Sequence, residues 1–180
     1  MFSGTKEPHI AMLEFMAELT KRVQEINPVL KPVVVGGSAV WIYSDGDHLT
    51  KDIDLVVEDR QVVKDVLLEL GFKQSESIRH WYHDDRDIVI EIPDDTLAGD
   101  MDKVTIVPVK GIDVYIIGVE DLLIDRLCAA KHWGSDRDEY QSIFLLSFYE
   151  DEMDWAYLKK RATEEQVSDL LENLKNKLAD

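Results

Sequence analysis

The sequence predicts an α+β fold in which a mixed β-sheet is flanked by helices and followed by a helical C-terminal extension. Three observations support this fold class: apolar residues recur at helical spacing near the N-terminus, β-branched runs then alternate with helical segments, and only helical patterns follow residue 118. The 180 residues, of which 45% are hydrophobic, suffice for one well-filled core. We therefore expect a sheet part with an N-terminal helix over residues 1–118 and a helical part over 119–180, packed together as a single compact unit.

Five elements are predicted in the first seventy residues. They are a helix over 7–26, a strand over 33–35, a helix over 38–43, a strand over 52–57 and a helix over 60–70. Asn27-Pro28 ends the first helix, because proline cannot continue a helical hydrogen-bond ladder. Gly71 follows the last of these helices, at the position where a glycine in the left-handed conformation commonly caps a helix.

A hairpin, two further strands and the helical part follow. Strand-like runs over 79–83 and 87–92 flank the polar Asp84-Asp85-Arg86, which indicates an antiparallel hairpin. Two more strands, over 104–107 and 112–117, give a mixed sheet of five or six strands. The remaining pattern predicts three or four helical pieces, over 120–133, 138–149, 154–161 and 164–178.

The charge balance argues against one class of partner, and the distribution of apolar residues indicates the compartment. The chain has 20 basic and 37 acidic residues and a formal net charge of -17, which argues against duplex DNA as a partner, because such binding requires Lys and Arg to neutralise phosphates. No run approaches the roughly 20 apolar residues that span a bilayer, and MFSGTKEPHI lacks the basic and apolar regions of a secretion signal. We expect a cytoplasmic protein with no membrane partner.

Asp52-Ile53-Asp54 lies inside a segment that otherwise reads as a buried strand. Because side chains of a strand alternate between its two faces, the two carboxylates share one face and lie about 7 Å apart. Two like charges at that separation raise each other's pKa unless a cation lies between them. Mg²⁺ or Mn²⁺ would neutralise them, since hard divalent cations prefer carboxylate oxygens.

The run DIVIEI carries an acid among isoleucines. If its strand lies beside the strand of Asp52, Glu91 becomes a third carboxylate ligand; Asp87, on the same face, is the alternative third acid. Two other interpretations remain open. The Asp-x-Asp segment can be an edge strand with a solvated face, and Glu91 can be neutralised by a salt bridge to Arg79 or Arg86.

Gly36-Gly37-Ser38 lies at a predicted turn from strand to helix. Glycine lets the backbone approach a phosphate closely, and the first turn of a helix offers free N–H donors with a favourable dipole. A metal-held phosphate and a phosphate-accepting helix start are the two halves of a phosphoryl-transfer site. The alternative is an ordinary turn.

The order strand, Gly36-Gly37-Ser38, helix, Asp52-Ile53-Asp54 resembles the minimal nucleotidyltransferases of the DNA-polymerase-beta-like superfamily. The text IIGVEDLLIDRLCAAKHWGSDRDEYQSIFLL, residues 116–146, is similar to the helix of that group that opens with a Val-Glu-Asp-Leu box. The box also occurs in related nucleotidyltransferase-like toxins of abortive-infection and toxin–antitoxin systems. The resemblance covers roughly residues 30 to 160 and implies a nucleotidyltransferase-type mixed sheet.

The resemblance also implies roles for individual residues. It makes Asp52, Asp54 and Glu91 the metal-binding and catalytic residues. The residues that it implies for nucleotide binding are Gly36, Gly37, Ser38, Arg126 and Lys131. Arg126 stands where related proteins commonly have a lysine, and an arginine replaces a point contact with a planar fork. On the same helix, spacing places Asp121 and Asp125 on one charged flank, which either lines a cleft or faces solvent.

Two function classes follow. The first is an enzyme that transfers a nucleoside monophosphate from an NTP to an unidentified acceptor, which is a small molecule, an RNA or a protein. The second is a non-catalytic protein with the same fold that acts through a cognate protein partner, as in a toxin–antitoxin pair. The C-terminal helices either pack on the sheet or form a homodimer surface. A plain α+β domain without a site is the third alternative.

Overall fold

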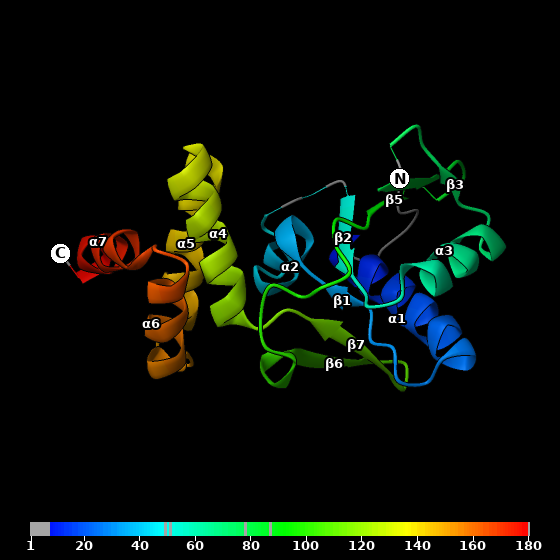
Figure 1. The fold of residues 1–180 in the computed structure, drawn as a ribbon, viewed down its shortest axis with the longest axis horizontal. Helices are drawn as coiled ribbons and strands as arrows, with labels where there is room; N and C mark the ends of the chain where they lie inside the picture. The colour runs from blue at the N-terminus through cyan, green and yellow to red at the C-terminus, as the bar shows by residue number, and fades with distance from the viewer. Residues whose placement is uncertain (1–7, 49, 51, 78, 87, 180) are drawn as a thin grey trace. The chain divides into compact units, whose positions relative to one another are not determined.

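The computed structural model describes residues 8–48, 50, 52–77, 79–86 and 88–179 (Figure 1). The chain divides into two compact units. The sheet unit comprises Met1–Leu97 and Met101–Ile117, and the helical unit comprises Ala98–Asp100 and Gly118–Asp180. The predicted boundary after residue 118 differs by one residue from the unit boundary after Ile117, whereas the sequence pattern does not indicate that residues 98–100 belong to the helical unit. The packing of the two parts into a single compact unit stays a prediction.

Within the described residues, the sheet unit contains seven strands in the order β3-β4-β5-β2-β1-β7-β6. The strands are β1 (Val33–Val34), β2 (Asp52–Val56), β3 (Lys73–Gln74), β4 (His80–His83), β5 (Ile88–Glu91), β6 (Thr105–Val109) and β7 (Ile112–Ile116). The helices are α1 (Pro8–Ile26), α2 (Gly36–Tyr43), α3 (Arg60–Glu69) and the 3₁₀ turn η1 (Met101–Lys103). The sheet is mixed, which confirms the predicted α+β class.

Strand β2 lies inside the sheet between β1 and β5. It pairs with β1 in antiparallel and with β5 in parallel orientation. The predicted hairpin is confirmed, because β4 and β5 pair antiparallel on either side of the polar turn. The two strands that carry the acids predicted from the sequence are therefore direct neighbours.

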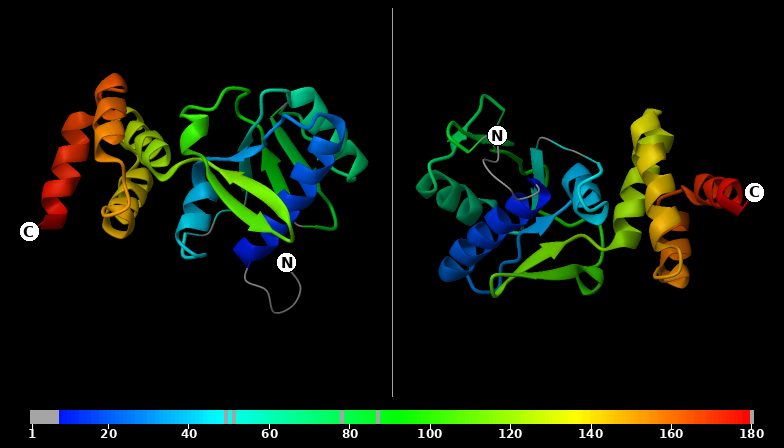
Figure 2. Two further views of the ribbon diagram at one scale, coloured as in Figure 1. Left: turned by 90° about the horizontal axis from the view of Figure 1, so that it is seen from below. Right: turned by 180° about the vertical axis from the view of Figure 1, so that it is seen from behind.

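The apolar face of β2 and β5 belongs to the core of the sheet unit. Ile53 and Leu55 from β2 and Ile88 and Ile90 from β5 are all buried, and each such side chain contributes roughly 1.5–3 kcal/mol when it leaves water. Helix α1 lies against β7 and α3 (Figure 2). Because strand side chains alternate, this buried face leaves the acidic residues on the opposite face.

The helical unit contains α4 (Val119–Trp133), α5 (Asp136–Tyr149), α6 (Trp155–Glu164) and α7 (Ser168–Ala179). These helices confirm the predicted C-terminal extension. Helix α4 packs against the other three helices and ends at Gly134 in the left-handed conformation. No helix in the described ranges is long and apolar enough to cross a membrane.

Candidate functional site

The predicted acids lie on two neighbouring strands of the sheet unit. Asp54 on β2 is the direct partner of Glu91 on β5, and Asp52 is level with Val89. Neighbouring strands lie about 4.8 Å apart, and Asp52 shares the face of Asp54 because it precedes it by two residues. All three acids are partly exposed. The structure therefore meets the condition on which the sequence argument depended, that the strand of Glu91 lies beside the strand of Asp52.

The Gly-Gly-Ser turn is attached directly to Asp54. The backbone N–H of Gly37 donates to Asp54 Oδ2 at 3.1 Å, and the backbone N–H of Val35 donates to the Asp54 carbonyl at 2.9 Å. Gly36 has a φ of 59°, and a Cβ atom there would lie 2.7 Å from Asp54 Oδ2. Such a close approach requires glycine. The two sequence motifs thus form one local structure at the start of α2.

Ser38 is completely buried behind this turn, with 0% of its surface exposed. Its hydroxyl donates to the Val35 carbonyl at 2.8 Å and accepts the backbone N–H of Asp54 at 3.0 Å. The side chain is therefore engaged with β1 and β2. The implied contact of Gly36, Gly37 and Ser38 with a nucleotide stays a prediction.

Glu91 has a partner that the sequence interpretation missed. His80 Nε2 lies 3.4 Å from Glu91 Oε2, and His80 Nδ1 lies 2.9 Å from Ser77 Oγ. The observed register pairs His83 with Ile88 and therefore His80 with Glu91. A three-residue turn at 84–86, as the sequence suggested, would instead pair residue 80 with residue 90, so the contact could not be foreseen. Arg86, one of the predicted salt-bridge partners of Glu91, instead pairs with Glu18 at 3.0 Å. Asp87 lies outside the described residues.

The chemistry of these side chains fits a hard divalent cation, because their oxygens are the ligands that Mg²⁺ prefers and their like charges repel each other without a cation. In the part of the chain that the structure describes, no group of three or more His, Cys, Asp or Glu side chains is arranged so that it could hold a metal ion. Each of two carboxylates contacts a protein group instead, Asp54 the Gly37 N–H and Glu91 the His80 ring. Binding of Mg²⁺ or Mn²⁺ by Asp52, Asp54 and Glu91 stays a prediction.

The two basic residues implied for phosphate binding belong to the helical unit and form ion pairs there. Arg126 pairs with Asp125 and, through Nη1, with Asp138 Oδ1 at 2.7 Å. Lys131 pairs with Asp169, and this hydrogen bond lowers the pKa of the Asp169 carboxyl. Both cations therefore connect helices of this unit. Their contact with a nucleotide stays a prediction.

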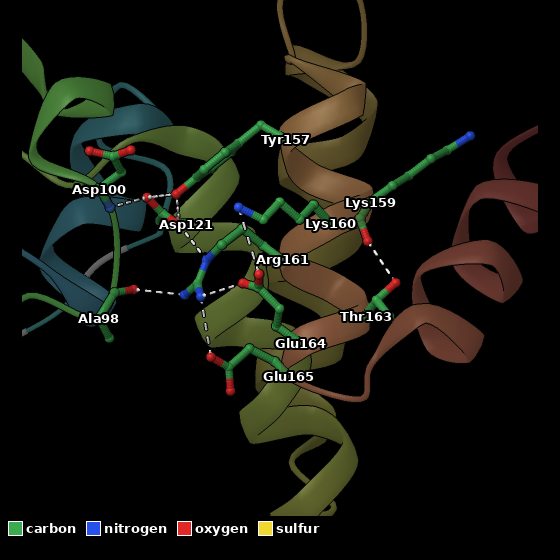
Figure 3. Close-up of polar contacts among 10 residues, drawn as sticks. All are labelled: Ala98, Asp100, Asp121, Tyr157, Lys159, Lys160, Arg161, Thr163, Glu164 and Glu165. Carbon is green, nitrogen blue, oxygen red and sulfur yellow. Dashed lines mark hydrogen bonds and ion pairs between the residues drawn. The ribbon is translucent and has the colours of Figure 1, made fainter.

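Asp121, expected on a charged flank of its helix, is instead completely buried. Its carboxylate accepts hydrogen bonds from Tyr157 Oη at 2.8 Å, from the Asp100 backbone N–H at 2.9 Å and from Arg161 Nε at 3.2 Å (Figure 3). A Cβ atom on Gly99 would lie 2.5 Å from Asp121 Oδ2. Asp121 therefore neither lines a cleft nor faces solvent, because it holds residues 98–100 against α4 and α6. Neither helical periodicity nor local sequence predicts these contacts, because the partners Asp100 and Tyr157 lie 21 and 36 residues from Asp121 in the chain.

Solved structures with the same fold come from nucleotidyltransferases. ANT(2'')-Ia in complex with adenylyl-2''-tobramycin matches with a TM-score of 0.63 and 12% identity, over 88% of this chain and 97% of that one. An antigenic nucleotidyltransferase-like protein from Paracoccidioides brasiliensis matches with a TM-score of 0.60 and 15% identity, over 93% of each chain. At these identities the likeness shows the fold.

The sequence itself matches a family model. No curated protein is similar enough in sequence to match the chain. Residues 11–178, however, match the model of a family described as a nucleotidyltransferase of unknown function, DUF6036. Because that model spans nearly the whole chain, the protein belongs to this nucleotidyltransferase family, which confirms the resemblance seen in its Gly-Gly-Ser and Asp-x-Asp motifs.

Proposed function

We propose that the protein is a Mg²⁺- or Mn²⁺-dependent enzyme that transfers a nucleoside monophosphate from an NTP to an acceptor. The observation that carries this proposal is the register of β2 and β5, which pairs Asp54 with Glu91 beside the Gly-Gly-Ser turn. Membership of a nucleotidyltransferase family supports the reaction class. A structural neighbour with adenylyl-2''-tobramycin bound, a nucleotide joined to an acceptor, is consistent with it.

In the proposed mechanism Asp52, Asp54 and Glu91 hold the divalent cation. When bound, this cation supplies charge neutralisation at the phosphates and lowers the pKa of the attacking hydroxyl. One of these carboxylates accepts the proton of the acceptor hydroxyl. The acceptor oxygen then forms a bond to the α-phosphorus, the bond from the α-phosphorus to the bridging oxygen breaks, and pyrophosphate leaves with the bond's electron pair.

The start of α2 is the proposed phosphate site. Gly36, Gly37 and Ser38 form its first turn, where backbone N–H groups and the positive end of the helix dipole attract anions. Arg126 and Lys131 are the proposed cationic contacts of the triphosphate. For that role they must exchange their present carboxylate partners for phosphate oxygens, and a guanidinium can make two parallel hydrogen bonds to a phosphate.

The proposed partners are an NTP and an acceptor with a nucleophilic hydroxyl, which is a small molecule, an RNA or a protein. Duplex DNA is a poor partner for a chain of net charge -17, because binding to it relies on neutralised phosphates. The cytoplasm, which supplies NTPs, is the proposed compartment.

The proposal is tested with α-labelled ATP, GTP, CTP and UTP, each incubated with the protein and cell extract in Mg²⁺ or in a chelator. We expect a labelled product that requires the metal, and a loss of at least about 100-fold in Asp52→Asn and Asp54→Asn, because even indirect contacts to a metal site are worth 10–100-fold. Asp113→Asn, an exposed position on β7, is the matched control. Undiminished labelling in both site variants, with folds retained by circular dichroism, would remove this mechanism.

A second candidate function is a non-catalytic nucleotidyltransferase-fold protein that acts through a cognate protein partner. The observation that favours it is that protein groups already contact two of the carboxylates, Gly37 at Asp54 and His80 at Glu91. Calorimetry with the four NTPs, with and without Mg²⁺, separates the two candidates. Metal-dependent NTP binding supports the enzyme, and absence of binding to all four NTPs supports the interaction protein.

A further inference from the structure

We infer that the hydroxyl of Ser38 positions Asp54 and does not bind the nucleotide phosphates. Ser38 is thereby a positioning residue of the proposed metal site. The geometric part of this inference stands on the structure alone, and its consequence for metal binding rests on the proposed function.

The hydrogen-bonding capacity of the Ser38 hydroxyl is directed toward the protein. A hydroxyl has one hydrogen to donate, and the Ser38 hydrogen is directed at two carbonyl oxygens, those of Val35 at 2.8 Å and Asp54 at 3.3 Å. One of its lone pairs accepts the Asp54 N–H at 3.0 Å. Phosphate oxygens at neutral pH require donors, so this hydroxyl can bind a phosphate only by giving up a carbonyl inside a fully buried environment.

The same turn contacts the backbone N–H, the carbonyl and one carboxylate oxygen of Asp54. Its backbone N–H donates to Ser38, its carbonyl accepts from Val35 N at 2.9 Å, and its carboxylate accepts from Gly37 N at 3.1 Å. Three residues of one turn thus hold both the backbone and the side chain of one proposed ligand. Groups that hydrogen-bond a ligating carboxylate orient it and tune the affinity of the site for metal.

A phosphate role and a positioning role predict different losses in Ser38→Ala. If the hydroxyl binds phosphate, the variant binds metal as the wild type does and loses affinity only for the NTP. If the hydroxyl positions Asp54, the variant loses metal affinity when no nucleotide is present. The two roles are therefore separated by a measurement that involves no turnover.

Calorimetric titration with Mn²⁺ in the absence of nucleotide is the test. We expect Ser38→Ala to bind Mn²⁺ about 10–100-fold more weakly than the wild type, which is the usual loss for a residue that supports a metal ligand. Ser38→Thr retains a hydroxyl and is expected to restore most of the affinity. Ser44→Ala is the matched control, because Ser44 is also a buried serine of the α2 end and accepts the His48 backbone N–H at 3.0 Å.

Amide hydrogen exchange gives a second readout that does not depend on metal. We expect the Asp54 amide to exchange faster in Ser38→Ala and at the wild-type rate in Ser44→Ala. The inference is overturned if the Asp54 amide keeps its protection in Ser38→Ala, or if that variant keeps its Mn²⁺ affinity and loses NTP affinity. Failure of the proposed function looks different: wild type and Asp54→Asn then both show no Mn²⁺ binding, and the exchange rate alone decides whether Ser38 positions Asp54.

Discussion

Gly36 is the residue on which the contact between the Gly-Gly-Ser turn and Asp54 depends most. Its positive φ disfavours any side chain, and a Cβ atom would meet the Asp54 carboxylate at 2.7 Å. Gly134 at the end of α4 has nearly the same φ, 64°, but a Cβ atom there would have no neighbour within 4 Å. Substitution of each glycine in turn therefore distinguishes the free-energy cost of the left-handed backbone, which both positions share, from the cost of the close contact, which only Gly36 has.

We predict that Gly36→Ala lowers the free energy of unfolding by about 1–3 kcal/mol more than Gly134→Ala does. Both variants incur the left-handed penalty of about 1–2 kcal/mol, and only Gly36→Ala also overpacks its surroundings, at a typical cost of about 1–3 kcal/mol. Urea denaturation followed by circular dichroism measures the difference. Equal destabilisation of the two variants would show that the Asp54 carboxylate moves aside without cost.

Residue spacing was sufficient to predict that Asp52 and Asp54 share a face, because alternation along a strand is a local property. It was not sufficient to predict where the hydroxyl of Ser38 points. That direction depends on the approach of the turn to β2, sixteen residues further along the chain. Partners at such separations are fixed by tertiary packing, which no local pattern records.

The helices and most strands followed their sequence signals closely. The short strand β3 was missed, because two exposed residues carry no alternation that could indicate a strand. The sequence interpretation placed both glycines in the turn and began the helix at Ser38. In the structure α2 begins at Gly36. Gly71 adopts the predicted left-handed conformation after α3, with a φ of 87°.

The contact between α4 and α6 has a consequence for stability at high pH. Burial, followed by the hydrogen bond to the Asp121 carboxylate, raises the pKa of Tyr157 above its usual range. A group with a raised pKa in the folded state contributes stability that is complete below its unfolded pKa, about 10 for tyrosine, and that is lost as the pH rises above it. Deprotonation of Tyr157 therefore opposes folding in alkaline solution.

We predict that the free energy of unfolding falls more steeply above about pH 10 in the wild type than in Tyr157→Phe, because phenylalanine has no proton to lose. Urea titrations at a series of pH values measure both profiles. Tyr140→Phe, at a tyrosine that is 64% exposed, serves as the control and is expected to follow the wild type. Parallel profiles of wild type and Tyr157→Phe would contradict the prediction.

Considered as a whole, the chain passes between its two units three times, after Leu97, after Asp100 and after Ile117. The first two passages exist because Asp121 and Arg161 hold the short segment Ala98–Asp100 in the helical unit. The helical tail was predictable from periodicity, but this segment was not. The placement of this segment depends on the buried carboxylate of Asp121, which accepts a hydrogen bond from the Asp100 backbone N–H, twenty-one residues earlier in the chain.

We predict that Asp121→Ala lowers the free energy of unfolding by about 1–3 kcal/mol, because the partly buried Tyr157 hydroxyl and Arg161 guanidinium both lose a hydrogen-bond acceptor. We also expect faster hydrogen exchange at the Asp100 amide, which loses its acceptor. Glu164→Gln, which removes an exposed carboxylate that pairs with Arg161 and Lys160, should cost less than about 1 kcal/mol. An unchanged Asp100 exchange rate in Asp121→Ala would show that residues 98–100 are held by other contacts.

The two border strands of the sheet, β3 and β6, bear on how the protein behaves at high concentration. β3 has only two residues, both solvent-facing, and one is the charged Lys73, whose ammonium group pairs with Asp84. β6 contains Pro108, which lacks a backbone N–H. Short, charged or proline-containing borders give an incoming chain no continuous row of hydrogen-bonding groups to copy. Edge-to-edge pairing of copies of this sheet is therefore disfavoured at both borders.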